Sequence, residues 1–251
     1  MRSGKRLHPS LPSQRGLVPR RHESEQVPFA FRSPAHAHQV MDGPLGAYLR
    51  EEMEAKGIHG FPIGAFENGM RVMTLTNRPI AVPEDLNGIR MRVPPAQIIN
   101  DTLRAFGAEP VSITIDGVYD ALKSGKVHGQ ENPLAIVELF RLYEVVKYIS
   151  MTNHIWSGFN LLANLGAWER LPDDVKTVIE RNVTRHVRLQ RQEQMALNAR
   201  LRMELSRRGL TVNDVDPAPF RRKLPAVYLK WKKQLGTKCW SLLEAETGAL
   251  G

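Results

Sequence analysis

The feature that most constrains the fold is a long helical segment between Pro172 and Gly209. Proline followed by Asp173 and Asp174 is typical of a helix start, because acidic side chains favour the positive end of the helix dipole. Apolar residues then recur at helical spacing on both sides of a polar run; they are Val175, Ile179, Val183, Val187, Leu197, Leu201 and Leu205. A helix of roughly 36 residues spans about 54 Å, more than one small domain. The segment predicts a helix that crosses between two lobes, and the alternative is a helical hairpin broken near Gln192.

Before this helix, short apolar strands alternate with amphipathic helices. We expect a helix from Pro44 to Gly57, a strand at 58–66, a turn at Gly69 and a second strand at 70–76. Further strands are expected at 89–93, 111–114, 127–130, 143–151, 154–164 and 210–212, and further helices at 94–107, 117–124, 134–140 and 217–235. This alternation indicates an α/β fold with mostly parallel sheets.

The composition argues against several classes of function. The formal net charge of +9 suggests nucleic acid, but residues 1–26 hold six basic residues against two acidic ones, and no basic stripe interleaved with aromatic residues follows. We therefore expect a basic surface and no nucleic-acid partner. The single cysteine, Cys239, excludes disulfide scaffolds and Cys-rich zinc sites within one chain. The sequence has no G-x-S-x-G, H-E-x-x-H or P-loop motif, and His36 and His38 have no third ligand at suitable spacing, so we expect no enzyme, metal or cofactor.

Arg92 is the strongest candidate for ligand binding. It ends an alternating apolar and basic strand, just before Pro94 and Pro95. Ligands of α/β proteins sit beyond the carboxyl ends of strands, and a guanidinium matches a carboxylate through two parallel hydrogen bonds. The alternative for Arg92 is a structural salt bridge, for example to Glu131.

Asn132 is a second candidate, because it lies in a strand-to-helix turn between Glu131 and Pro133. An amide in such a turn can orient a ligand by donating and accepting hydrogen bonds. The alternative is that Asn132 caps the following helix, a position that favours asparagine.

Several segments together resemble the DctP-type solute-binding subunits of tripartite ATP-independent periplasmic (TRAP) transporters. The resemblance covers roughly residues 27–235 in order and at family spacing. The segments that carry it are Asp42-Gly43-Pro44-Leu45-Gly46, Leu86-Asn87-Gly88-Ile89-Arg90-Met91-Arg92-Val93-Pro94, Phe106-Gly107-Ala108-Glu109-Pro110-Val111, Gly129-Gln130-Glu131-Asn132-Pro133, Tyr143-Glu144-Val145-Val146-Lys147-Tyr148 and Thr152-Asn153-His154.

The resemblance implies two α/β lobes around a cleft, crossed by a long helix. It implies that the cleft closes over a small organic acid, such as a dicarboxylate, sugar acid or keto acid, and that the loaded protein docks on membrane subunits in the periplasm as a monomer. Arg92 matches the family arginine that pairs with the ligand carboxylate, Asn132 a cleft asparagine, and Arg71 a second ligand arginine of some members. Glu131, Ile115 and Pro95 complete the expected ligand site.

The chain also departs from the family pattern. His128 stands where an aspartate usually precedes Gly129, and Ile115 stands where an aromatic residue is common. Residues 1–26 do not resemble the family and contain no export signal, so we expect a disordered basic tail there. The resemblance implies that the family's amino-terminal region is missing. We expect a first, truncated lobe of 27–70 with 158–197 and a second lobe of 71–157 with 198–251. The alternative function is a truncated, non-functional remnant of a binding protein.

Overall fold

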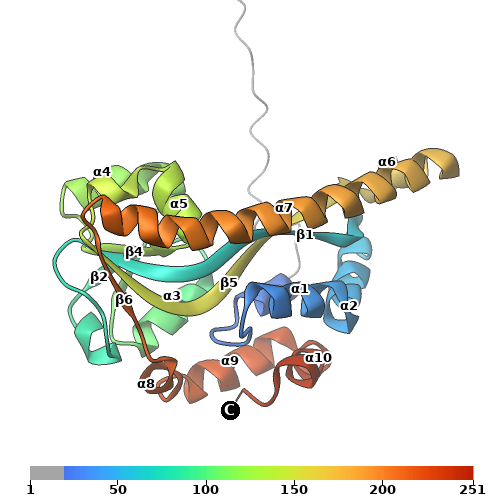
Figure 1. Ribbon diagram of the computed structural model, residues 1–251. Helices are drawn as coiled ribbons and strands as arrows, with labels where there is room; N and C mark the ends of the chain where they lie inside the picture. The colour runs from blue at the N-terminus through green and yellow to red at the C-terminus, as the bar shows by residue number, and fades with distance from the viewer. Residues whose placement is uncertain (1–19, 251) are drawn as a thin grey trace, which may run out of the picture.

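The computed structural model describes residues 20–250, which form one mixed sheet covered by helices (Figure 1). The six strands are β1 (Ile58–Leu75), β2 (Arg90–Val93), β3 (Glu109–Ser112), β4 (Gly129–Asn132), β5 (Tyr148–Asn164) and β6 (Thr211–Asp214). Their order in the sheet is β3-β2-β4-β1-β5-β6. β2 is parallel to β3 and β4, and β5 is parallel to β6, whereas β1 is antiparallel to both of its neighbours. The α/β class is confirmed.

Two long strands, β1 and β5, replace pairs of shorter strands that the sequence predicts. β1 runs through the expected turn at Gly69, where the ladder with β5 shifts register and the glycine takes a φ of +139°. A Cβ at Gly69 would come within 2.8 Å of Asn198 and of Pro133, so close packing also favours glycine here. β5 likewise continues through Asn153, which has a φ of 44°. The predicted breaks are therefore irregularities within continuous strands.

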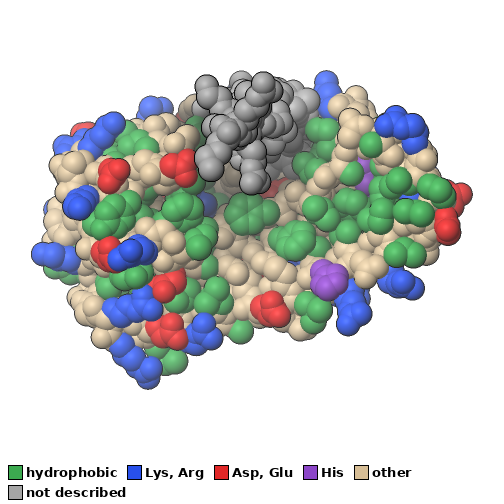
Figure 2. All heavy atoms as spheres, turned by 90° about the horizontal axis from the view of Figure 1, so that it is seen from above, with side chains coloured by type: hydrophobic (Ala, Val, Ile, Leu, Met, Phe, Trp, Pro, Cys, Tyr) green, Lys and Arg blue, Asp and Glu red, His purple; other side chains and the backbone are tan. Residues whose placement is uncertain are grey.

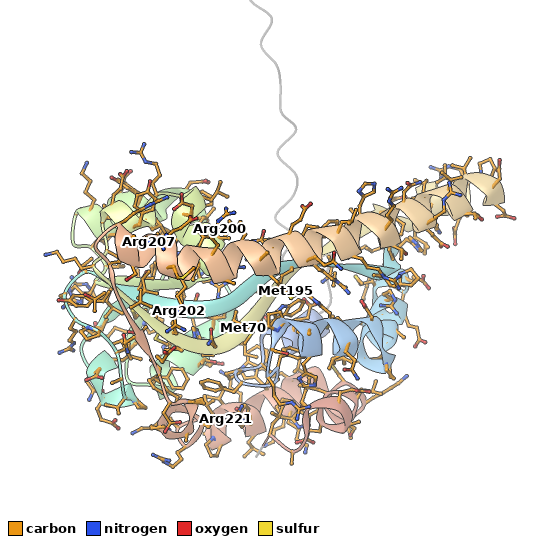
Figure 3. The ribbon with its side chains drawn as sticks, viewed as in Figure 1. Met70, Met195, Arg200, Arg202, Arg207 and Arg221 are labelled. Carbon is orange, nitrogen blue, oxygen red and sulfur yellow. The ribbon has the colours of Figure 1, made fainter. Side chains whose placement is uncertain are left out.

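The prediction of one long helix is confirmed, because α7 is continuous from Asp173 to Arg207. It crosses the sheet, and its amino-terminal part extends beyond the rest of the molecule (Figure 1). Gln190 of α7 exchanges two hydrogen bonds with the backbone of Glu67 on β1, at 2.9 and 2.7 Å. Arg202 reaches β6, where it pairs with Asp214 at 2.7 Å (Figure 3). The carboxyl-terminal half of α7 is thus fixed to the sheet, from Gln190 to Arg202.

The other helices cover the sheet and its ends. The α-helices are α1 (Pro34–Asp42), α2 (Pro44–Glu54), α3 (Gln97–Ala105), α4 (Val118–Lys123), α5 (Leu134–Leu139), α6 (Leu165–Glu169), α8 (Pro217–Arg221), α9 (Pro225–Leu235) and α10 (Thr237–Thr247). The 3-10 helices are η2 (Arg20–Gln26), η3 (Pro83–Leu86), η4 (Ile115–Gly117) and η5 (Leu142–Glu144). The single helix expected at 217–235 is wrong, because the chain leaves the helix before Pro225 and begins a new one there. α1 and α10 were not predicted.

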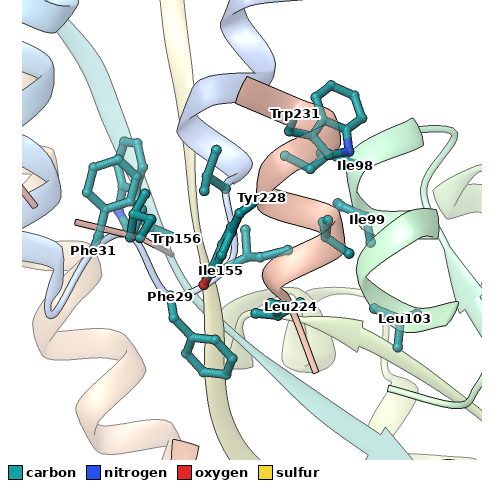
Figure 4. Packing of buried hydrophobic residues seen from close by; sticks show 14 of the residues in the cluster. Phe29, Phe31, Ile98, Ile99, Leu103, Ile155, Trp156, Leu224, Tyr228 and Trp231 are labelled. Carbon is teal, nitrogen blue, oxygen red and sulfur yellow. The ribbon is translucent and has the colours of Figure 1, made fainter. Parts of the chain in front are cut away.

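Buried apolar side chains form two clusters. The larger one joins the segment before α1 to α3, α9 and α10, and Figure 4 shows part of it around Tyr228 and Trp231. The smaller one lies among α4, α5, the end of α7 and the adjoining strands, and it includes Val118, Leu201 and Leu205. Two separate clusters agree with a two-lobed fold. The lobe boundaries given above stay a prediction.

The expected disordered tail is wrong for residues 20–26, which form η2. Ser24 and Glu25 are buried there, and Glu25 accepts a hydrogen bond from Asn160 of β5 at 2.8 Å. Residues 1–19 lie outside the described part of the chain. On the face seen from above, basic side chains lie around the rim with acidic ones among them, not in a stripe (Figure 2). Between residues 20 and 250, no helix has both the length and the apolar character needed to cross a membrane.

Candidate functional site

The candidate site is built on three adjacent strands, β2, β4 and β1. Arg92 is the third residue of β2, in register with Gln130 on β4 and Val111 on β3. Its side chain is buried, with a residue exposure of 2%, and its Nε donates to the carbonyl oxygen of Ile113 at 2.7 Å. Arg92 is therefore held by its Nε, and its two terminal nitrogens have no acceptor among residues 20–250.

Arg71 of β1 forms a buried ion pair with Glu131 of β4. Its Nε donates to Glu131 Oε2, and its Nη2 donates to Glu131 Oε1 at 2.6 Å and to the Glu131 carbonyl oxygen at 2.7 Å. The same Nη2 also donates to Asn132 Oδ1 at 3.2 Å. Glu131 is fully buried and Arg71 is nearly so. Each side chain therefore supplies the charge that allows the other to be buried.

An amide network continues from this ion pair. Asn132 donates from Nδ2 to Gln130 Oε1 at 2.5 Å, and Gln130 donates from Nε2 to Thr74 Oγ1 at 2.7 Å. All three side chains are buried. Because Asn132 Oδ1 accepts from Arg71, the network fixes which way round the Asn132 amide lies.

His154 of β5 is a second partner of the Glu131 carboxylate. Its Nε2 lies 3.4 Å from Glu131 Oε2, and its Nδ1 lies 2.8 Å from the hydroxyl of Thr152. His154 has no exposed surface. Both ring nitrogens therefore face protein groups, and β5 is tied to the same cluster.

The electrostatics of the cluster follow from burial and from the neighbouring charges. Burial by itself would raise the pKa of Glu131, but the charge of Arg71, with hydrogen bonds from His154 and Arg71, holds that pKa below its usual value. Burial lowers the pKa of Arg92 to about 10; the charge of Arg71 adds to this effect and that of Glu131 opposes it. Arg92 therefore stays charged at neutral pH, in a place where an unpaired cation is unfavourable.

The structure decides between several alternatives for the predicted site residues. The carboxylate of Glu131 is occupied by Arg71, so the structural salt bridge considered for Arg92 is made by a different arginine. Asn132 is not a helix cap, because α5 has Pro133 at that position. Ile115 is half-buried in η4, near the carbonyl that holds Arg92, whereas Pro95 is exposed at a bend. The ligand roles of Arg92, Asn132, Arg71, Glu131, Ile115 and Pro95 stay predictions.

Sequence reasoning did not assign roles to Gln130, Thr74, Thr152 or His154. The signal available for Thr152 and His154 was a polar pair on alternate positions of a strand that continues into Ile155 and Trp156. The two histidines considered for a metal contact different parts of the chain. His38 is buried and lies 2.6 Å from Glu67 Oε2, while His36 Nε2 lies 3.1 Å from the carbonyl oxygen of Glu246.

A mixed sheet crossed by one long helix is an architecture that this chain shares with periplasmic solute-binding proteins of known structure. The crystal structure of a TRAP periplasmic solute-binding protein from Roseobacter denitrificans with bound β-D-glucuronate superposes with a TM-score of 0.86. It is 26% identical and covers 92% of this chain and 76% of its own. A TRAP protein from Polaromonas bound to D-erythronate has a TM-score of 0.80 and 29% identity, over 91% of this chain and 75% of that one.

The family model of DctP, bacterial extracellular solute-binding protein family 7, matches residues 4–234, and the chain belongs to this family. The match corrects the expectation that residues 1–26 do not resemble the family. The C4-dicarboxylate-binding periplasmic protein DctP of Rhodobacter capsulatus is 33% identical over 175 residues, which are 70% of this chain and 52% of that protein. The chain thus spans about half of the length of this curated relative.

Proposed function

We propose that this chain is the solute-binding component of a TRAP transporter in the periplasm. It captures a small organic carboxylate between two lobes and delivers it, as a monomer, to the membrane subunits of the transporter. The family supports the transport role, and the names and bound ligands of the relatives support the carboxylate class, since they include a C4-dicarboxylate, glucuronate and erythronate.

The observation that carries this proposal is that Arg92 is buried and uses only its Nε in a hydrogen bond to residues 20–250. A buried guanidinium whose terminal nitrogens lack an acceptor among residues 20–250 is unfavourable unless an anion completes it. A ligand carboxylate supplies both the charge and two acceptor atoms in the geometry of the guanidinium. Because the site is buried, the ion pair is screened less by solvent than a surface pair would be.

Replacement of Arg92 by lysine is expected to weaken carboxylate binding at least tenfold, or about 1.4 kcal/mol, because an ammonium cannot form the two parallel hydrogen bonds. Calorimetric titration with erythronate, glucuronate and succinate measures the change. Arg90→Lys is the matched control, because Arg90 lies on the same strand and donates to the carbonyl oxygens of Lys126 and Gly125. Unchanged affinity in Arg92→Lys would refute Arg92 as the carboxylate partner.

A further inference from the structure

The amino-terminal half of α7 carries three arginines that no carboxylate of residues 20–250 neutralises. Arg181, Arg185 and Arg188 are exposed, and none of their side chains forms an ion pair or hydrogen bond with that part of the chain. Because they stand four and three residues apart, they are neighbours on one side of the helix. Like charges at these spacings destabilise a helix, and an external anion would relieve the repulsion.

The carboxyl-terminal half of the same helix has its charges arranged differently. Arg200 pairs with Glu204 at 2.9 Å, and Arg202 pairs with Asp214 at 2.7 Å (Figure 3). Arg207 lies in the last turn, where the helix dipole favours a cation. Positive charge without a partner is therefore concentrated in the half of α7 that extends beyond the rest of the molecule (Figure 1).

The three arginines line one hollow on the surface of α7. Its other lining residues in the described part of the chain are Thr184, Leu189 and Gln192. Thr184 and Gln192 can both donate hydrogen bonds, and no acidic side chain of residues 20–250 lines the hollow. The hollow therefore presents guanidinium groups and neutral donors to a common space, a combination that suits a phosphate group.

Apolar side chains are exposed beside these arginines. Val178 is 47% exposed and Leu189 is 43% exposed, and they lie about three helical turns apart, so both point to the same side of α7. Arg185 stands about one turn before Leu189 on that side. A helix that combines arginines with exposed aliphatic residues in this way is typical of helices that lie at a membrane interface. Their arginines reach lipid phosphates while the aliphatic groups enter the boundary of the acyl chains.

We propose that the amino-terminal half of α7 binds the surface of an anionic phospholipid membrane, with lipid phosphates at the three arginines and with Val178 and Leu189 at the acyl boundary. This surface is separate from solute capture, because Arg92 and its neighbours are buried on the sheet. It would hold the protein beside the membrane, so that the search for the membrane subunits takes place in two dimensions. Nucleic acid fits less well, because the described lining of the hollow contains no aromatic side chain on which a base could stack.

Sedimentation with vesicles tests the proposal on the full chain. One set of vesicles contains phosphatidylcholine alone, and the other contains phosphatidylcholine and phosphatidylglycerol in equal parts. Binding to the anionic vesicles is expected to be at least ~10-fold tighter at low ionic strength and to weaken as salt is added, because salt screens exposed charges. The vesicles contain neither a solute nor a membrane subunit, so the result does not depend on the proposed function.

Replacement of Arg181, Arg185 and Arg188 together by glutamine is expected to weaken binding to the anionic vesicles at least ~10-fold, because each basic residue near the surface contributes to the attraction. Glutamine is chosen because it is a good helix former. Residues 1–19 are kept in every protein, so their basic side chains contribute equally throughout.

The matched control replaces Arg104, Arg207 and Arg222 by glutamine. It removes the same net charge from exposed positions on α3, in the last turn of α7 and at the end of α8. Because these positions do not share a surface with Val178 and Leu189 in the proposal, the control is expected to lose less than ~3-fold in binding.

A second variant separates a lipid surface from a free phosphate ion as the partner. Val178→Gln combined with Leu189→Gln keeps every charge but removes the aliphatic groups, and it is expected to bind the anionic vesicles at least ~3-fold more weakly. Inorganic phosphate, added at the phosphate concentration of the lipid, is expected not to displace the unaltered chain from the vesicles.

The possible results are distinct. Equal binding to both kinds of vesicle, or equal losses in the triple arginine variant and its control, overturns the proposal. Displacement by inorganic phosphate, with no effect of the double variant, also overturns it and assigns the hollow to a free anion. An oligonucleotide that displaces the vesicles and binds without any effect of the double variant assigns the hollow to nucleic acid instead. Cooperative unfolding shows that each variant is folded, and if the triple arginine variant is not, the two kinds of vesicle and the double variant decide.

Discussion

Replacement of Glu131 by alanine is expected to lower the free energy of unfolding by about 3–5 kcal/mol, because removing one member of a buried ion pair leaves the other charge without compensation. Arg71 would lose the acceptors of its Nε and of one Nη2 hydrogen bond while remaining buried. This loss is a large part of the total free energy of unfolding of a typical protein, which is about 5–15 kcal/mol. Urea unfolding monitored by tryptophan fluorescence measures the difference.

The pH dependence of this difference follows from the lowered pKa of Glu131. A carboxyl group whose pKa is lower in the folded state stabilises the fold above its unfolded-state pKa, about 4.3 for glutamate, and loses that contribution as the pH falls through the folded-state pKa. The difference in the free energy of unfolding between the unaltered chain and Glu131→Ala is therefore expected to be largest at pH 7 and to decrease below about pH 4. A gap that stays constant down to pH 2 would contradict the ionic origin of the stabilisation.

The control for this prediction is Asp214→Ala, which removes an exposed carboxylate paired with Arg202. Exposed ion pairs contribute little, because solvent screens them and both side chains lose freedom on pairing. The variant is expected to unfold at nearly the same urea concentration as the unaltered chain. If both variants were equally destabilised, burial would not be the reason for the effect at Glu131.

Much of the fold could be predicted from local patterns. α7 was predicted within a residue of its observed bounds, because its apolar spacing and its proline and glycine boundaries are local signals. The continuity of β1 could not be predicted, because glycine at 69 is compatible with a turn and with a bulge, and only the partner strand decides between them. α10 was missed because its buried residues, Cys239, Trp240 and Leu243, make a short pattern just after a glycine.

The pairing of charges in the candidate site could not be predicted from the sequence. The resemblance to the DctP family placed Arg92, Arg71, Glu131 and Asn132 in one expected ligand site. It did not predict which arginine pairs with Glu131. That choice depends on the antiparallel register of β1 and β4, in which Met73 lies opposite Glu131, and register is a property of two distant segments. Only the structure therefore shows that Arg71, and not Arg92, pairs with Glu131.

A second buried polar cluster joins α1, β1, β5 and α7 at the point where the long helix crosses the sheet. Glu67 Oε2 lies 2.6 Å from His38 Nε2 and accepts from Trp156 Nε1 at 2.8 Å. The Trp156 ring also makes edge contacts with Phe31 and His38, at centroid distances of 5.8 and 6.0 Å. Because Gln190 of α7 binds the backbone of Glu67, the position of the helix depends on this cluster.

Trp156→Ala is expected to lower the free energy of unfolding by about 3–5 kcal/mol, since it opens a large cavity in the core and removes one hydrogen bond from a buried carboxylate. Trp156→Phe keeps most of the ring volume and is expected to have a smaller effect. Phe159→Ala, on the same strand but 58% exposed, is the control and is expected to change stability little. Chemical unfolding gives the three values, and hydrogen exchange at Glu67 reports its contact with α7. An effect of Trp156→Ala as small as that of Phe159→Ala would show that the cluster does not hold the helix on the sheet.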